Sequence, residues 1–285
     1  MHEKKGNFTT VLLVLILLVG LSLLLYPTVS DYWNSFHQSR AIATYAEQVA
    51  EIEDDLYEAL WAEAADYNRT LVGRDSDRYR MTEEEQTLYN GLLNAFGNGI
   101  LGYIEIPEIG CSLPVYHGTD PAVLQIAVGH IEGTSLPVGG ENTHSVLSGH
   151  RGLPSARLFT DLDKLQNGDI FLIRVLDETL TYEVDQIRIV EPADLSDLEI
   201  EAGQDYCTLV TCTPYGINTH RLLVRGHRIE NVEEAKVIRV TADAMQIEPL
   251  LVALAVAIPI LLVLLICLLL PKRPQKRGSE FDEVP

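Results

Sequence analysis

Two long apolar runs near the ends of the chain constrain its folding more than any other feature. Residues 8–26 and 250–270 are each long enough to cross a bilayer, which takes about 20 mainly apolar residues. Loops on the cytoplasmic side of a membrane are enriched in Lys and Arg. We therefore predict a two-pass protein of the cell membrane, with residues 27–249 outside the cell and both termini, residues 1–7 and 271–285, in the cytoplasm. The basic residues of the two terminal segments are Lys4, Lys5, Lys272, Arg273, Lys276 and Arg277.

Each run has an alternative interpretation that the flanking residues disfavour. The first would be a cleavable signal peptide if a small-residue site of the Ala-x-Ala kind followed it, but residues 27–30 read Pro-Thr-Val-Ser. The second would be a removable sorting tail if a Leu-Pro-x-Thr-Gly motif preceded it, and residues 244–249 contain none. Two membrane-spanning helices are therefore the expectation.

The segment between the runs is strongly acidic. Four of the 41 acidic residues and six of the 21 basic residues lie in the terminal segments, which leaves a net charge of about −22 between the runs. Nucleic-acid binding needs the opposite sign, because contacts to phosphates supply most of its affinity. The charge excludes a nucleic-acid partner. The acidic surface is either simply solvated or suited to basic, Lys-bearing partners.

The four cysteines do not suggest a disulfide scaffold in a segment of this size. Cys267 lies in the second apolar run, where a thiol serves as a small apolar side chain. Cys207 and Cys212 are five residues apart in one strand-like run, so their side chains point to opposite faces. Cys111 and Cys207 are expected to be buried free thiols, although an oxidising compartment also permits a bridge between them.

The periodicity of apolar residues divides the outer segment into three parts. Residues 27–67 are expected to be helical, because apolar residues recur there at three- and four-residue spacing. Residues 68–98 are polar and contain a short helix that opens with the N-cap pattern Thr82-x-x-Glu85. They form either a linker or a functional loop.

Residues 99–230 have the pattern of a β-domain. Runs rich in β-branched and aromatic residues alternate with turns rich in Gly, Pro, Asn and Asp, which predicts a closed barrel or a sandwich of at least eight strands. A short helical excursion is expected at residues 153–165, and a last edge strand at 237–241 within the linker 231–249. The predicted strands are residues 102–107, 113–116, 145–148, 169–174, 179–184, 186–190, 206–211 and 221–225.

A thiol, an imidazole and a guanidinium occur at the ends of these runs. Cys212 ends one run, Arg221 begins the next, and His150 lies in the glycine-flanked loop 148–152. A cationic neighbour favours the thiolate form of a cysteine, a histidine can carry the proton, and a guanidinium can stabilise an oxyanion. Taken singly, the same residues also suit structural roles. No His-x-x-x-His or Cys-x-x-Cys spacing occurs, so neither a metal nor a cofactor is expected.

Several motifs, in this order along the chain, resemble the sortases, and in particular their pilin-polymerising class C. Thr-Leu-Val-Thr-Cys-Thr-Pro-Tyr-Gly at residues 208–216, continued by His-Arg-Leu-Leu-Val-Arg-Gly at 220–226, resembles the class C form of the cysteine signature. Ser-Gly-His-Arg-Gly-Leu-Pro at 148–154 resembles the histidine segment of that class. Residues 102–107 and 113–118 resemble its first strands.

The resemblance covers about residues 40–270 and implies an eight-stranded sortase β-barrel with N-terminal helices, a lid loop and two transmembrane helices. It implies that Cys212 is the nucleophile, His150 the acid and base, and Arg221 the third catalytic residue. The implied reaction cleaves an LPxTG-like sorting signal between Thr and Gly through a thioester and passes the acyl group to a pilin Lys amine, in a Gram-positive bacterium. Alternatives are a sortase that anchors single surface proteins to the cell wall, a membrane-tethered cysteine peptidase, and a non-catalytic pilus assembly factor.

A lid loop of this class carries Asp-Pro followed by an aromatic residue, and residues 68–98 occupy the corresponding place. Residues 74–79 read Arg-Asp-Ser-Asp-Arg-Tyr and lack the proline. Asp77 and Tyr79 keep the acid and the aromatic ring at the same spacing. They are therefore the expected lid anchors, with Asp77 paired to Arg221 and Tyr79 over Cys212. Without proline to fix φ, the loop is expected to be less pre-organised.

Overall fold

The computed structural model describes residues 3–74 and 76–231. The described part of the chain divides into two units, residues 3–25 and residues 26–231. Helix α1 (Glu3–Val49) supplies the described part of the first unit and continues into the second.

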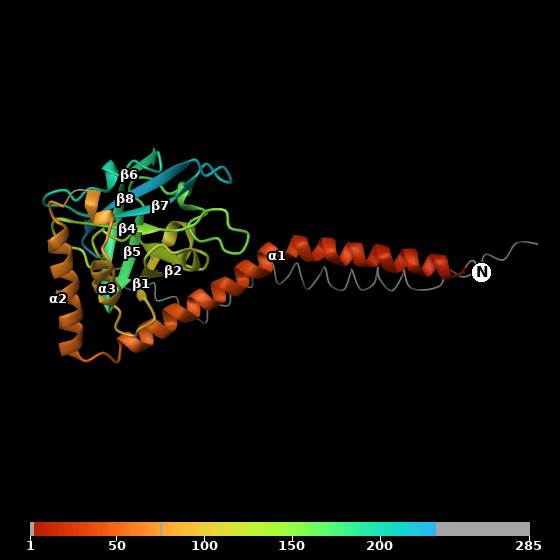
Figure 1. Cartoon of the computed structure of the whole chain (residues 1–285), viewed down its shortest axis with the longest axis horizontal. Coiled ribbons are helices and arrows are strands. Elements are labelled where there is room, and N and C mark those ends of the chain that lie inside the picture. The colour runs from red at the N-terminus through yellow and green to blue at the C-terminus, as the bar shows by residue number, and fades with distance from the viewer. Residues whose placement is uncertain (1–2, 75, 232–285) are drawn as a thin grey trace, which may run out of the picture. The chain divides into compact units, whose positions relative to one another are not determined.

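The second unit contains a closed barrel whose strands follow the order β1-β2-β3-β4-β7-β8-β6-β5 (Figure 1). The pairs β2–β3 and β4–β7 are parallel, and the other six pairs are antiparallel. The predicted eight-stranded barrel is thereby confirmed. The strands are β1 (Ile100–Ile106), β2 (Cys111–His117), β3 (Val128–His130), β4 (Thr143–Ser148), β5 (Ile170–Val175), β6 (Glu178–Val190), β7 (Asp205–Thr213) and β8 (His220–Ile229).

Three segments differ from the prediction. β6 is one 13-residue strand where the sequence predicts two, because the chain passes through a register irregularity between Val184 and Gln186 without leaving the sheet. β3 was not predicted, since three residues are too few to show alternation. The predicted helix at residues 153–165 is wrong: this segment contains only the 3-10 turn η3 (Leu162–Lys164), and Leu158 has a left-handed φ of 40° that no helix accommodates.

The barrel interior is filled by every second residue of each strand. Ile104 of β1, Cys207 and Leu209 of β7 and Val224 of β8 are all fully buried in one core cluster. Alternation of this kind places the neighbouring residues on the outer surface of the barrel. The side chain of residue 212 therefore lies on the face opposite to that of Cys207, as the sequence predicts.

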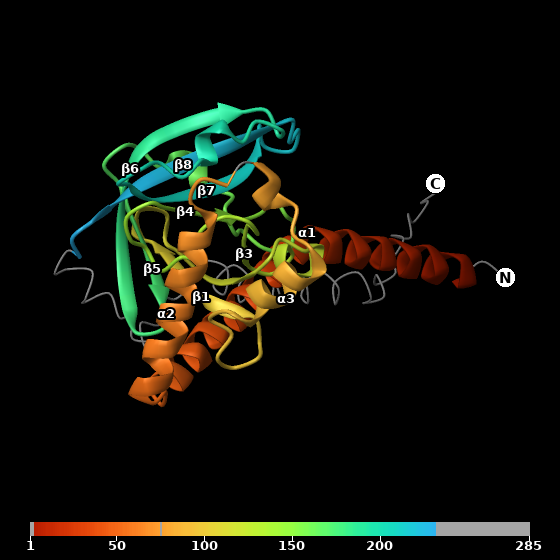
Figure 2. The same ribbon diagram turned by 60° about the vertical axis from the view of Figure 1, so that its left-hand side comes forward.

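The helical segment of residues 27–67 belongs to two helices. α1 ends at Val49, and α2 (Asp54–Leu71) follows a short turn. α2 and α3 (Glu83–Gly91) lie beside the barrel in both views (Figures 1 and 2). The predicted N-cap of α3 is confirmed as a reciprocal capping box between Thr82 and Glu85. The remaining short elements are α4 (Pro121–Leu124), η1 (Ser76–Tyr79), η2 (Pro107–Ile109) and η4 (Ser196–Leu198).

A buried tyrosine ties α1 to the barrel. The hydroxyl group of Tyr45 donates a hydrogen bond to the carbonyl of Leu101 at 3.1 Å and accepts one from the amide of Leu176 at 2.8 Å. Burial raises the pKa of Tyr45 to about 12. The end of α1 is thus held against both β1 and the turn after β5.

One helix among the described residues is long and apolar enough to cross a membrane. It covers Val11–Val49, with a mean hydropathy of 2.6 in its most apolar window. The second apolar run, 250–270, and the edge strand predicted at 237–241 lie outside the described residues.

Cys111 and Cys207 are free thiols, as the sequence favours. Burial raises the pKa of Cys111 to about 12 and the pKa of Cys207 well above its ordinary value. Because the thiolate is the reactive form, the raised pKa disfavours reaction of both thiols at neutral pH.

Candidate active site

Cys212 and Arg221 face each other across two neighbouring strands. The antiparallel register of β7 and β8 pairs Cys212 with Arg221. Directly opposite residues project from the same face of a sheet, with Cβ atoms about 4.5–5.5 Å apart. Both side chains are half-buried, and Nη1 of Arg221 donates to the carbonyls of His220 at 3.1 Å and Asn218 at 3.4 Å. The thiol and the guanidinium therefore share one face of the barrel.

His150 lies on the other side of this thiol, in the loop that follows β4. The parallel ladder between β4 and β7 ends with the pairing of Ser148 and Val210. The loop then continues along β7, because the amide of Gly149 donates to the carbonyl of Val210 at 3.0 Å and Oγ1 of Thr211 donates to the carbonyl of Gly149 at 2.7 Å. His150 is the second residue after Ser148, and Cys212 is the second residue after Val210, so both follow the last pair of this ladder at the same end of β4 and β7.

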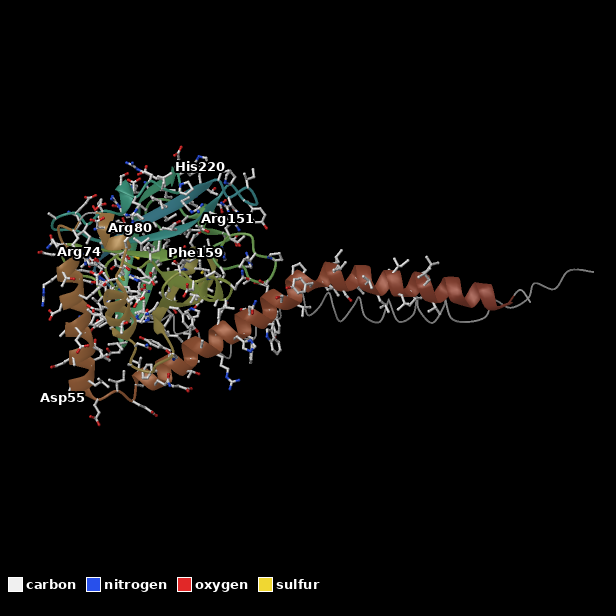
Figure 3. All side chains as sticks on the ribbon, in the orientation of Figure 1. Asp55, Arg74, Arg80, Arg151, Phe159 and His220 are labelled. Atoms are coloured by element: carbon white, nitrogen blue, oxygen red, sulfur yellow. The ribbon has the colours of Figure 1, made fainter. Side chains whose placement is uncertain are left out.

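The three residues that the sequence selects thus form one row at the neighbouring ends of β4, β7 and β8, with His150 just beyond the last residue of β4. Burial lowers the pKa of His150, so its imidazole is neutral at neutral pH and can accept a proton from the thiol. Arg221, on the far side of Cys212, is placed to neutralise charge that develops on a carbonyl oxygen under attack. Figure 3 marks this end of the barrel by its labels for Arg151 and His220, the direct neighbours of His150 and Arg221.

An apolar cluster adjoins the row on the outer face of the barrel. Val146 of β4, Val210 of β7 and Leu223 of β8 pack there against Leu198 of η4, apart from the barrel interior. Leu198 belongs to the β6–β7 connection, residues 191–204. This connection therefore covers the face of the sheet on which the thiol lies.

A buried histidine holds the β6–β7 connection to the barrel. Nδ1 of His144 contacts the carbonyl of Glu199 at 2.8 Å, and its Nε2 contacts Oγ1 of Thr208 at 2.7 Å. Burial lowers the pKa of His144 to about 4. The neutral imidazole satisfies both contacts, because one ring nitrogen donates and the other accepts.

The segment predicted as a lid is docked through Arg78, a residue that the sequence reasoning did not select. The side chain of Arg78 is only 2% exposed, and its Nη2 donates to the carbonyl of Leu198 at 3.0 Å and pairs with Glu199 at 3.2 Å. It also donates to the hydroxyl of Tyr79 at 3.0 Å, and its guanidinium carbon lies 5.0 Å from the centre of that ring. Asp77 is exposed and forms no ion pair among the described residues.

The backbone of this segment packs tightly on the β3–β4 connection. Gly133 has a φ of +80°, and a Cβ atom on it would lie 2.3 Å from the carbonyl oxygen of Arg78 and 3.1 Å from Cα of Tyr79. Only glycine permits both the conformation and the approach. η1 is therefore held between the β3–β4 and β6–β7 connections.

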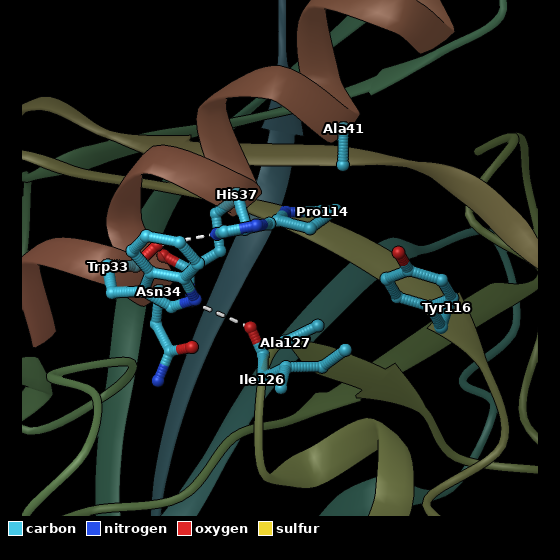
Figure 4. Close-up of a pocket in the computed structure, with 9 residues that line it drawn as sticks. Trp33, Asn34, His37, Ala41, Pro114, Tyr116, Ile126 and Ala127 are labelled. Carbon is cyan, nitrogen blue, oxygen red and sulfur yellow. Dashed lines mark hydrogen bonds between the residues drawn. The ribbon is translucent and has the colours of Figure 1, made fainter. Parts of the chain in front are cut away.

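A cavity of about 250 Å³ lies elsewhere, between α1 and the start of the barrel (Figure 4). Nε2 of Gln38 donates to the carbonyl of Ile126 at 2.7 Å, and Nδ1 of His37 contacts the carbonyl of Trp33 at 2.8 Å. None of the three residues in the catalytic row lines it. Its lining is Trp33, Asn34, His37, Gln38, Ala41, Pro114, Tyr116, Ile126 and Ala127.

Comparison with known proteins agrees with this geometry. Residues 104–229 match the sortase domain model. Sortase D of Bacillus subtilis is 32% identical over 131 residues, which are 45% of this chain and 63% of that protein. Sortase A of Staphylococcus aureus is 32% identical over 42% of this chain and 58% of that protein. The match thus spans less than two thirds of the length of either curated relative.

Solved structures match over a larger share. The crystal structure of sortase C1 from Streptococcus agalactiae is 53% identical, covers 68% of this chain and is itself fully covered, with a TM-score of 0.65. Sortase C of Streptococcus pneumoniae is 45% identical, over 67% of this chain and 97% of that one, with a TM-score of 0.60.

The chain therefore belongs to the sortase family, whose members are cysteine transpeptidases. Within the family it groups with the sortases C.

Proposed function

We propose that this protein is a membrane-anchored sortase that polymerises pilins. It cleaves an LPxTG-like sorting signal between Thr and Gly and transfers the acyl group to a Lys amine of the next subunit. The observation that supports the proposal is the pairing of Cys212 with Arg221 across β7 and β8, together with the position of His150 in the loop after β4, the strand that pairs with β7 on its other side. A nucleophile, a proton carrier and an oxyanion partner in adjacent positions are what acyl transfer through a thiol requires.

The proposed reaction has two halves. His150 takes the proton of Cys212, and the thiolate attacks the carbonyl carbon of the signal's Thr while Arg221 stabilises the oxyanion. The imidazolium then protonates the leaving Gly amine, and a thioester remains. In the second half a neutral Lys amine attacks the thioester, His150 takes its proton, and the released thiolate regains a proton from the imidazolium. No oxidant, metal or cofactor enters the balance.

The proposal that the substrates are pilins rests on fewer observations than the proposed chemistry does. Three solved sortases C share 42–53% identity with this chain, and the structure of the Streptococcus pneumoniae enzyme among them bears on pilin substrate specificity. The strongly acidic outer segment would attract a Lys-bearing acceptor at low ionic strength.

The full chain in detergent micelles tests the function with an LPxTG-like peptide and a Lys-bearing peptide, followed by mass spectrometry. An amide between the Thr carbonyl and the Lys side chain is the expected product. A free Thr carboxylate alone would indicate a peptidase, and unreacted peptide would indicate an assembly factor. Preference for wall-derived amines over the Lys peptide would favour anchoring of single proteins instead.

Membrane anchoring through α1 is part of the proposal, and the exposed residues that follow its apolar run support it. Tyr26, Val29, Trp33 and Phe36 recur at three- and four-residue spacing, and each is more than half exposed. On another side of the helix, Nδ2 of Asn34 donates a hydrogen bond to the carbonyl of Ser155 at 2.8 Å. Aromatic residues are enriched where a span meets the membrane surface.

This arrangement predicts the environment of Trp33. The chain contains two tryptophans, so Trp61→Phe leaves Trp33 as the only emitter. In vesicles its fluorescence should be quenched by brominated lipids and only weakly by aqueous iodide. The complementary variant Trp33→Phe reports Trp61, which packs on the domain core and should escape the lipid quencher. Free access of iodide to Trp33 would place this part of α1 in water.

We also propose that the segment of residues 68–98 acts as a lid, as the class C resemblance implies, and that Arg78 holds it closed. Arg78→Ala leaves Glu199 without its buried partner, so the segment should dissociate from the β6–β7 connection. Because apparent affinity scales with the fraction of open enzyme, alkylation of Cys212 by a bulky maleimide should accelerate by about tenfold.

Arg80→Ala is the matched control for the lid, because Arg80 lies in the same segment and is exposed (Figure 3). It should leave the alkylation rate unchanged. Asp77→Ala and Tyr79→Ala test the anchors predicted from the sequence in the same assay. Equal rates for the parent enzyme and all four variants would make residues 68–98 a plain linker.

A further inference from the structure

We infer that Arg151 is a positioning residue, which sets the imidazole of His150 against the thiol of Cys212. The inference rests on the proposed roles of His150 and Cys212. Arg151 itself would touch neither the substrate nor the reacting atoms. Arg151 follows His150 directly in the chain. It is a charged side chain that is only 9% exposed, which is costly unless the charge is paired.

The guanidinium of Arg151 joins the histidine loop to the end of β7. Its Nη1 donates to Oγ1 of Thr213 at 3.4 Å, and Thr213 is the residue that follows Cys212. Its Nη2 pairs with the carboxylate of Asp163 in η3. One planar fork thus links three segments at fixed spacing, which a single ammonium group could not do.

Tyr215 of the β7–β8 loop packs against the guanidinium of Arg151. The guanidinium carbon of Arg151 lies 5.8 Å from the centre of the Tyr215 ring. Gly152 has a φ of +76°, and a Cβ atom on it would lie 3.0 Å from that ring. The loop that carries His150 is therefore in close contact with the loop that joins Cys212 to Arg221.

The position of His150 relative to β7 depends on this connection, because the other hydrogen bonds described for the far side of its loop lead to residues 159 and 160 and not to β7. Before His150, the loop is tied to β7 by backbone hydrogen bonds at Gly149. At His150 itself, the carbonyl accepts from the amide of Phe159 at 3.1 Å. After His150, the amide of Gly152 donates to Oγ1 of Thr160 at 3.1 Å, and the side chain of Arg151 bonds the loop to β7 through Thr213. Loss of that tie lets the imidazole move relative to the thiol, and a displacement of about 1 Å can cost about 10²-fold in rate.

The experiment measures kcat, KM and the pH profile of peptide transfer for the full-length enzyme and its variants. Arg151→Ala should lower kcat by about 10- to 100-fold with KM for the sorting peptide unchanged. Arg151→Lys should recover only part of the loss, since it keeps the charge and not the fork. Alkylation of Cys212 by iodoacetamide at alkaline pH, which needs no histidine, should stay within about twofold of the parent rate.

Arg157→Ala is the matched control, because Arg157 pairs with Asp161 in the same β4–β5 connection and is 69% exposed. It should leave kcat unchanged. Thr213→Val removes one hydrogen-bond partner of Arg151 with little change in shape. If Arg151→Ala does not fold, this variant tests whether the link between Arg151 and β7 affects catalysis. It should lower kcat without changing KM.

Three results would overturn the inference: an unchanged kcat in Arg151→Ala and Thr213→Val, a loss that lies wholly in KM, or full recovery in Arg151→Lys, which would indicate a charge effect alone. An inactive parent enzyme would instead refute the proposed function itself.

Discussion

Cys212→Ala should abolish peptide transfer, with a loss of kcat of about 10⁴-fold or more. The thiol is the group that forms the acyl bond in the proposed reaction, and no neighbouring side chain can replace it. The melting temperature should change little, because the side chain is small and half-buried. Mass spectrometry of the amide product and a thermal melt of the same sample check both statements.

Cys111→Ala is the matched control for this variant. Cys111 is a free thiol outside the catalytic row, and burial raises the pKa of its thiol to about 12, which disfavours the reactive thiolate at neutral pH. The control should therefore transfer peptide at the parent rate. Residual transfer by Cys212→Ala at a comparable rate would show that the nucleophile has been misassigned.

Arg221→Lys should lower kcat by about 10²–10³-fold, the usual loss when one oxyanion donor is removed. Lysine keeps the positive charge, but a single ammonium cannot reproduce the planar array of donors. The position opposite Cys212 is fixed by strand pairing, so a shorter reach is not compensated by movement of the backbone. Steady-state kinetics with the sorting peptide measure the effect.

Arg225→Lys provides a comparison on the same strand. Arg225 pairs with Asp185 and stacks on Tyr206, four residues away from the row. Its replacement should affect stability more than kcat. If Arg221→Lys were as active as the parent enzyme, the guanidinium would act only by steering the charge of the substrate.

Much of the barrel could be predicted because its strands alternate and end in turn residues. The cysteine and arginine were predictable as neighbours, since a hairpin between two consecutive runs brings their ends together. The irregularity at Val184 was not, because a strand with a bulge and two strands with a turn have similar sequences. The two-helix arrangement of residues 27–67 depends on packing against the barrel, which the apolar stripe does not specify.

The parts of the site that escaped prediction involve buried arginines. Arginine is usually exposed, but both of these side chains are buried against partners that are distant in the sequence. Arg78 contacts Leu198 and Glu199, and Arg151 contacts Thr213 as well as the nearer Asp163. The available signal for Arg78 was its position, since it stands where the related lids have proline. For Arg151 the signal was its place directly after the histidine. Neither position reveals a partner.

The strand order has a consequence for how the molecule forms. β1 pairs with both β2 and β5, so the first six strands can assemble as one open sheet whose free edges are β4 and β6. Only β7 and β8, the last two strands, fill the gap between these edges. They bring the thiol and the guanidinium with them, and the histidine loop gains its ties to β7 in the same event. Until that closure the chain exposes two unpaired edges, and closure both protects the edges and assembles the catalytic row.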